Sequence, residues 1–155
     1  MSITRLHHAG LTVANLERSL DFYVGLLGFE VLSRRVIDRP WLAQLLGLDA
    51  AVVHAVDLAV PGTDQVLQLF RFTVPSAAPV DPGMTNPGSV HVAFIVEGLR
   101  ALFERLVAAG AAPLAPPVSI TSGANAGGLL ACLRDPDGVV VEFYEAPSPP
   151  TAGSG

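Results

Sequence analysis

The stretch LHHAGLTVANLERSLDFYVGLLGFEVL, residues 6–32, decides the fold, because VHVAFIVEGLRALFERLVAAGAAPL at residues 90–114 repeats its pattern. When His8 is aligned with His91, three apolar pairs coincide: Leu11 with Phe94, Val13 with Val96 and Leu16 with Leu99. Internal similarity of this kind indicates a duplicated structural unit. Each copy begins with alternating apolar residues and continues with apolar residues at helical spacing. We therefore predict a strand followed by a helix of about three turns, twice.

Signals at the ends of these segments agree with that prediction. Asn15 is a suitable N-cap for a helix beginning at Leu16, and Gly28 and Gly110 are suited to end the two helices. Strand-like runs follow each helix. In the first copy, residues 51–60 and 65–72 are separated by PGTD, and in the second, residues 129–134 and 139–146 are separated by DPDG. Both pairs have the turn composition of hairpins.

The predicted fold class is therefore α+β, with two βαβββ modules in tandem. We predict a single domain over residues 1–147, with module one at about 4–73, a Pro-rich linker at about 74–87 and module two at about 88–147. A short helix is expected within residues 36–48, inserted in module one. The tail, residues 148–155, lacks apolar residues to bury and is expected to be disordered.

Composition excludes several classes of function. The formal net charge is −5, and no basic run is interleaved with aromatic residues, so nucleic acid is not an expected partner. No apolar run approaches the roughly 20 residues of a membrane span, and the N-terminus does not resemble a signal peptide, so we expect a cytoplasmic protein. Cys132 is the only cysteine, which rules out a disulfide within the chain.

Strand alternation indicates which side chains share a face of each sheet. In module two, His91 falls opposite the apolar set that is suited to pack under a helix. In module one the same alternation places His7 with the helix-facing residues and His8 on the other face. His8 is thus the predicted equivalent of His91.

The last strands of the two modules supply a second matched pair. QVLQLFRF aligns with VVVEFYEA so that Gln68 falls on Glu142, each a polar group within an apolar strand. A carboxylate in such a strand costs several kcal/mol unless it is paired or bound to a metal. If the two modules pair about a pseudo-twofold axis, His8, Gln68, His91 and Glu142 converge in one cup. Two imidazoles, an amide oxygen and a carboxylate suit a divalent first-row metal.

The repeated unit, the openings H-x-G-L-x-V and H-V-A-F-x-V, and the ending DPDG-x-x-x-E-F resemble the vicinal oxygen chelate superfamily over residues 4–147. The superfamily includes glyoxalase I, methylmalonyl-CoA epimerase, extradiol dioxygenases and metal-free bleomycin-binding proteins. The resemblance implies a cup-shaped, mostly antiparallel half-barrel with one divalent ion (Ni, Co, Mn, Zn or Fe) on the same four residues. A His, Gln, His, Glu set is most similar to the epimerase, whereas bacterial glyoxalase I usually has Glu in place of Gln68.

Three neutral ligands and one carboxylate leave the site positively charged, which suits stabilisation of an enolate-like oxygen. We therefore expect a glyoxalase- or epimerase-type enzyme that moves a proton next to a carbonyl of a small-molecule substrate. A dioxygenase ranks lower, because Gln68 would crowd the open positions that iron needs for substrate and dioxygen. A metal-free ligand-binding or antibiotic-sequestering protein is the alternative from another class.

The general base is left open by the sequence. The epimerase family uses a glutamate on the strand before the Gln ligand, and His54 is near that position here; Asp57 or Glu142 are the alternatives. Trp41, in the inserted helix, is the candidate substrate-binding residue, although it could instead anchor that helix. By analogy with the superfamily we also expect a homodimer.

Overall fold

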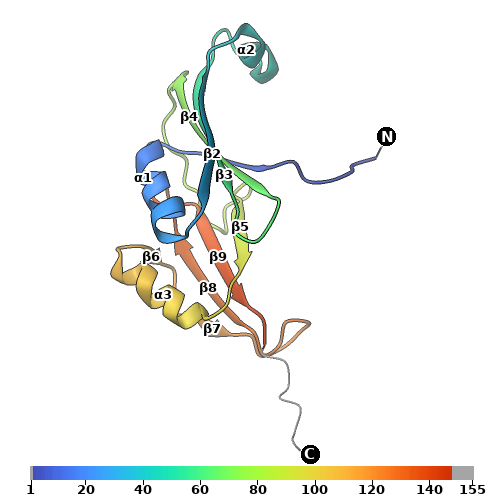
Figure 1. Cartoon of the computed structure of the whole chain (residues 1–155), viewed down its shortest axis with the longest axis vertical. Helices are drawn as coiled ribbons and strands as arrows, with labels where there is room; N and C mark the ends of the chain where they lie inside the picture. Colours follow the sequence, from blue (N-terminus) through green and yellow to red (C-terminus); the bar gives the residue numbers. More distant parts are fainter. Residues whose placement is uncertain (1, 148–155) are drawn as a thin grey trace, which may run out of the picture. The chain divides into compact units, whose positions relative to one another are not determined.

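The computed structural model describes residues 2–147, so the predicted disordered tail, residues 148–155, lies outside the described residues. The chain divides into two compact units, Met1–Val80 and Asp81–Gly155, and the boundary falls inside the predicted linker. Each unit is a mixed α/β module (Figure 1). Among residues 2–147, no helix is long and apolar enough to span a membrane.

Module one has the element order predicted from the sequence. Its strands are β1 (Ala9–Thr12), β2 (Glu30–Ile37), β3 (Val52–Ala59) and β4 (Val66–Val74), and its helices are α1 (Leu16–Leu20), which continues into the π-helical segment η1 (Asp21–Leu26), and α2 (Pro40–Leu46). The sheet order is β1-β4-β3-β2, with β1 parallel to β4 and the other neighbours antiparallel. The crossover through α1 is what allows β1 and β4 to run parallel.

Module two repeats this arrangement. It contains β5 (His91–Ile95), α3 (Leu99–Ala108), β6 (Ala112–Pro113), β7 (Val118–Ser119), β8 (Leu129–Arg134) and β9 (Val140–Glu145). The order is β5-β9-β8-β6, with β5 parallel to β9 and β7 paired with β8. The second strand of the unit, the counterpart of β2, is broken into the two-residue β6 and β7, since prolines at 113, 116 and 117 have no N–H to donate to a ladder. The duplicated α+β fold is confirmed, and neither sheet is closed.

The helix boundaries follow the predicted residues. The Asn15 side chain accepts hydrogen bonds from the backbone N–H groups of Glu17 and Arg18, at 3.0 and 3.3 Å. Gly28, at φ +77°, and Gly110, at φ +92°, follow the two helices in the left-handed conformation that glycine adopts without strain. Both predictions are confirmed.

The two faces of the module-one sheet carry different side chains. Leu11, Leu67, Leu69, Val56 and Leu58 are all buried and occupy one face, where α1 contacts β4. The other face carries Gln68 and, further along the same strands, the apolar cluster that α2 covers, formed by Leu42, Ala43, Ala51 and Val53 with Ile37, Phe70 and Phe72. The second face is therefore partly polar and partly apolar, as a binding surface for a small molecule requires.

Candidate functional site

In module one, strand register brings a polar group to the middle of the sheet. Gln68 on β4 is directly opposite Gly10 of β1 on one side and Asp57 of β3 on the other. Side chains that are directly opposite in a ladder share a face. Gln68 is 9% exposed, which makes it one of the few buried polar side chains of the module. Gly10, Gln68 and Asp57 thus form one row across three strands.

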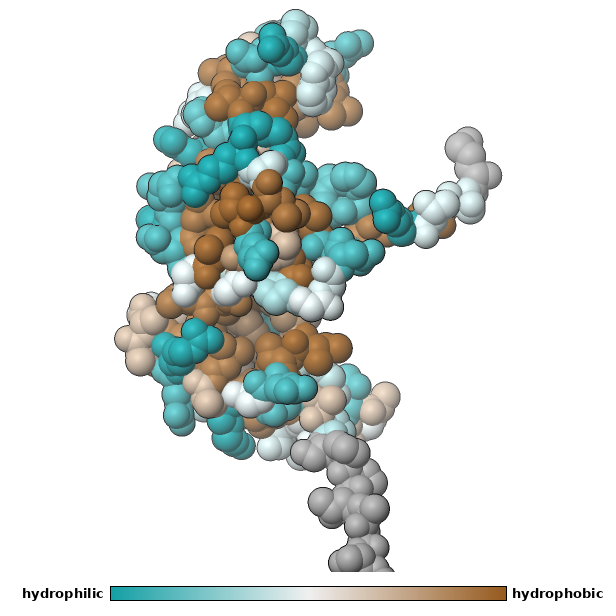
Figure 2. Space-filling model, viewed as in Figure 1, coloured by the Kyte–Doolittle hydropathy of each residue, from teal (hydrophilic) through white to brown (hydrophobic). Residues whose placement is uncertain are grey.

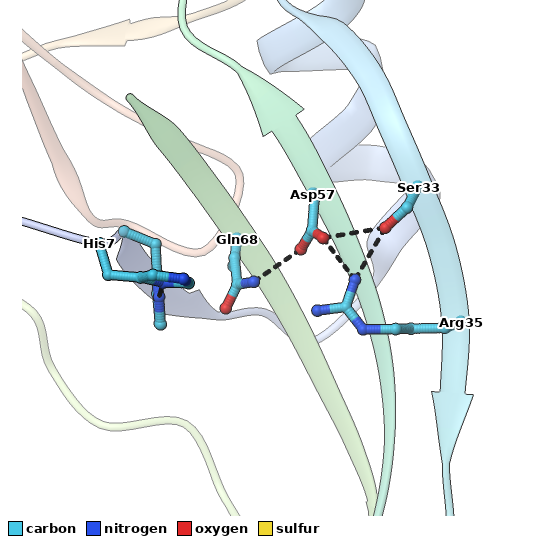
Figure 3. Close-up of polar contacts among 6 residues, drawn as sticks. His7, Ser33, Arg35, Asp57 and Gln68 are labelled. Carbon is cyan, nitrogen blue, oxygen red and sulfur yellow. Dashed lines mark hydrogen bonds and ion pairs between the residues drawn. The ribbon is translucent and has the colours of Figure 1, made fainter. Parts of the chain in front are cut away.

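A hydrogen-bonded network extends that row onto β2 (Figure 3). The amide Nε2 of Gln68 donates to Oδ1 of Asp57 at 2.8 Å. The other carboxylate oxygen, Oδ2, accepts from the Ser33 hydroxyl at 2.9 Å and forms an ion pair with Arg35. The same guanidinium also donates to the Ser33 hydroxyl at 2.8 Å. Both oxygens of Asp57 are therefore occupied by donors from the sheet.

Asp57 is held in its ionised form by these neighbours. Burial alone would raise the pKa of the Asp57 carboxyl, but hydrogen bonds from Arg35 and Ser33, the positive charge of Arg35 and the amide of Gln68 together lower the pKa below its usual value. A carboxylate with a lowered pKa and fully used oxygens is a poor proton acceptor near neutral pH. Its position suits support of Gln68 better than base catalysis.

His8 contacts the face that carries Gln68. Its ring meets Phe70 edge-on at a centroid distance of 6.5 Å, and Phe70 follows Gln68 on the same face of β4. The Nδ1 atoms of His7 and His8 are 2.7 Å apart, so one nitrogen must carry the proton and the other accept it. This contact contradicts the prediction that strand alternation separates His7 from His8. Both residues precede β1, where alternation has not yet begun.

Module two has polar residues at the same register positions, but with different side chains. Glu142 of β9 is opposite Ala93 of β5, two residues after His91, and opposite Cys132 of β8. Glu142 is half-buried, and its Oε2 lies 3.9 Å from the Cys132 thiol. Burial, followed by the negative charge of Glu142, raises the pKa of Cys132, so the thiol stays protonated. His91 is exposed and shares the face of Glu142 by strand alternation.

The two remaining candidates have different surroundings. His54 is opposite Arg71 and three residues from Asp57 on β3, so alternation places it on the other face of the sheet from Gln68. This register does not favour His54 as a base beside Gln68. Trp41 is 53% exposed on α2, so it does not anchor that helix. Figure 2 shows apolar surface at the α2 end of module one. Leu45, also on α2, is 72% exposed.

The predicted metal ligands in each module have atoms that hydrogen bonds leave available to a metal. Within residues 2–147, no donor reaches Oε1 of Gln68, and His91 makes no hydrogen bond. Glu142 has only the weak thiol donor of Cys132 beside it. No group of three or more His, Cys, Asp and Glu side chains in the described part of the chain is arranged to hold a metal. Each module by itself thus offers two candidate ligands, one imidazole and one oxygen donor.

Sequence reasoning missed the supporting network. The sequence offers Asp57 only as a possible base, and it does not indicate that Ser33 and Arg35 contact Asp57. The available signal was Asp57 itself, an acidic residue within the strand-like run AVVHAVDLAV. In the structure Asp57 is opposite Gln68 as Cys132 is opposite Glu142. The partners could not be inferred, because they come from β2, which precedes the inserted helix.

Comparison with known proteins agrees with this duplicated architecture. Residues 5–143 match the model of the Glyoxalase/Bleomycin resistance protein/Dioxygenase superfamily, and the chain belongs to that superfamily. A 2-epi-5-epi-valiolone epimerase from Actinomyces sp. is 27% identical over 146 residues, covering 92% of this chain and 80% of that protein.

Solved structures of the same superfamily resemble the chain over nearly its whole length. A glyoxalase family protein from Bacillus cereus superimposes with a TM-score of 0.82 at 20% identity, covering 96% of this chain and 97% of that one. A glyoxylase/bleomycin resistance protein/dioxygenase domain from Frankia sp. EAN1pec has a TM-score of 0.70 at 25% identity, covering 95% of each chain. The resemblance in sequence to the vicinal oxygen chelate superfamily is therefore confirmed.

Proposed function

We propose that this protein is a metal-dependent epimerase that moves a proton at a carbon next to the carbonyl of a small ketone. The observation that carries the proposal is the matched placement of one oxygen donor in the last strand of each module, Gln68 in β4 and Glu142 in β9. The similarity to an epimerase whose name gives a valiolone-type substrate supports the choice of reaction and of substrate class.

The residues that we propose as metal ligands are His8, Gln68, His91 and Glu142. When bound there, a divalent ion would act as a Lewis acid towards the carbonyl oxygen of the substrate. Gln68 in place of a second carboxylate leaves more positive charge for that oxygen. The chemical nature of the four donors suits Ni²⁺, Co²⁺, Mn²⁺, Zn²⁺ or Fe²⁺.

We assign the proton transfer to Glu142. Its carboxylate is half-buried on an apolar strand and has only the Cys132 thiol as a neighbouring donor, so one of its oxygens remains available to a proton. Asp57 is less suitable because Arg35 and Ser33 occupy its carboxylate. The apolar cluster beside Gln68, including Phe70 and Phe72, would exclude water from the substrate.

The first experiment tests metal binding and proton transfer together. Protein purified without chelator is loaded with Ni²⁺, Co²⁺, Mn²⁺ or Zn²⁺, and its metal content is measured; we expect one ion per chain. Valiolone-type ketones are then incubated with the protein in D₂O, and proton NMR follows deuterium entering the carbon next to the carbonyl. Exchange that depends on the metal supports the epimerase, whereas absence of bound metal under every condition contradicts it.

Glu142→Gln separates the epimerase from a sequestering protein. In the epimerase, this substitution should lower the exchange rate by at least about 10²–10⁴-fold, because it removes the group that carries the proton and also one of the proposed metal ligands. In a metal-free binding protein, ligand affinity should be almost unaffected. Arg100→Gln, on the exposed surface of α3, is a control that should behave as the unmodified protein.

A further inference from the structure

We propose that Asp57 is a positioning residue that fixes the orientation of the Gln68 amide, so that Oε1 rather than Nε2 is presented as the ligand atom. That Gln68 is a metal ligand rests on the proposed function. The orientation of its amide is inferred from the hydrogen-bond donors and acceptors of the network in module one. Asp57 itself contacts neither the proposed metal nor the substrate.

An amide side chain has two nearly identical ends, of which only the oxygen can bind a metal. A free Gln68 could place either end towards the ligand position at similar energy. An ionised carboxylate only accepts hydrogen bonds, so the end of Gln68 that faces Asp57 must be the Nε2 donor, as the 2.8 Å contact shows. The oxygen is then the end that remains for a metal.

The orientation of Asp57 is itself determined by donors on β2. Ser33 and Arg35 both donate to Oδ2, which leaves Oδ1 for Gln68. The side chains of Arg35 and Asp57 are 37% and 20% exposed, so the pair is only partly screened by water. Three strands of module one thus cooperate to orient one amide (Figure 3).

Module two shows why the acid is needed only in module one. The residue equivalent to Gln68 is Glu142, whose two side-chain ends are both oxygens and need no orientation. The residue equivalent to Asp57 is Cys132, a neutral and weak donor. The amide ligand Gln68 therefore has a carboxylate, Asp57, opposite it, whereas the carboxylate ligand Glu142 does not.

Asp57→Asn tests the inference because it changes the polarity and keeps the shape. Donors from Ser33 and Arg35 would hold the Asn oxygen where Oδ2 is now, which directs the Asn NH₂ group towards Gln68. Two donors would then face each other, so the Gln68 amide should rotate and present Nε2 to the ligand position. We expect the Kd for Ni²⁺, measured by calorimetry on the full chain after removal of metal with EDTA, to rise about 10–100-fold.

Two further variants distinguish a change in the orientation of the Gln68 amide from a general destabilisation of the site. Asp57→Asn combined with Gln68→Glu should bind Ni²⁺ at least about tenfold more tightly than Asp57→Asn alone, because either end of a glutamate can serve as ligand. Ser33→Ala removes one donor to Asp57 and leaves its acceptor towards Gln68, so its Kd should stay within about twofold of the unmodified protein. Unchanged affinity in Asp57→Asn, or no recovery in the double variant, would overturn the inference.

A readout without metal keeps this test independent of the proposed function. In the metal-free protein, one Gln68 side-chain N–H should resonate downfield in an NMR spectrum of ¹⁵N-labelled protein, as a hydrogen bond to a carboxylate requires, and this shift should disappear in Asp57→Asn. If the unmodified protein binds no Ni²⁺, the proposed metal site fails, and the amide spectrum still decides the orientation. Identical Gln68 spectra in the two proteins would contradict the role of Asp57.

Discussion

At the scale of single residues, backbone position decides what each polar side chain can do. Gln68, Asp57 and Gly10 share a row because β1, β4 and β3 are adjacent and their registers bring these residues opposite one another. His54, only three residues before Asp57, is on the other face. The sequence predicted Gln68 as a candidate ligand. The hydrogen bonds that Asp57 accepts from Ser33 and Arg35 follow from the pairing of β2 with β3, which the sequence did not predict.

Glycines give a test at this scale. A Cβ at Gly128 would lie 2.7 Å from Cε2 of Tyr144 and 3.0 Å from the backbone oxygen of Glu145, so Gly128→Ala should destabilise the fold by about 1–3 kcal/mol. Gly25 is exposed in η1 with nothing near its Cβ position, and Gly25→Ala should stabilise by about 0.5–1 kcal/mol. Urea unfolding measures both. Equal changes in the free energy of unfolding for the two substitutions would contradict the close packing of Gly128 and the open surroundings of Gly25.

At the scale of elements, the two helices that follow the first strands begin differently. Asn15 caps α1 with its own side chain, as the sequence predicted. Gly98, before α3, has no side chain to do so, and the Glu145 carboxylate at the end of β9 accepts from the N–H groups of Gly98 and Leu99 at 2.9 and 3.1 Å. The negative charge also suits the positive end of the helix dipole. A cap supplied from 46 residues further along the chain cannot be predicted from local sequence.

Removal of this cap should loosen α3. Glu145→Ala should lower the free energy of unfolding by about 0.5–2 kcal/mol, a cost similar to that of losing an N-cap side chain. Glu145→Gln, which keeps one acceptor and loses the charge, should cost less. Asn15→Ala is the matched variant in module one, where a loss of similar size is expected. Denaturant unfolding measures all three, and an unchanged midpoint for Glu145→Ala would refute the capping role.

At the scale of the whole molecule, duplication is the feature that links sequence to function. Both modules have a parallel first and last strand, with a polar residue at the same register position of the last strand. The internal repeat therefore predicted the fold class and the paired positions with no knowledge of any relative. It did not predict that β6 and β7 would be only two residues long, or that β2 would extend to Ile37 into the segment assigned to the inserted helix.

Metal-dependent stability tests whether His8 and His91 are both metal ligands, as we propose. Ni²⁺ at about 100 times its Kd should stabilise the folded protein by about 2.7 kcal/mol. For a chain of this size that corresponds to a rise in Tm of roughly 5–10 °C. His8→Ala and His91→Ala, one in each module, should each remove most of this rise. His54→Ala should retain it, because His54 is on the other face of the module-one sheet. A loss of the rise in only one of His8→Ala and His91→Ala would contradict the proposal that both histidines are ligands.

The duplication, the ends of the two repeated helices and the matched polar positions could be predicted from the sequence, because they follow from hydrophobic period, capping chemistry and turn residues, which act over a few neighbouring residues. The surroundings of those positions depend on the tertiary structure. Ser33, Arg35, Asp57 and Gln68 come from three strands, and their contacts depend on register between segments distant in sequence. Because both oxygens of Asp57 accept from donors on these strands, we infer that Asp57 orients the Gln68 amide and does not accept a proton from the substrate.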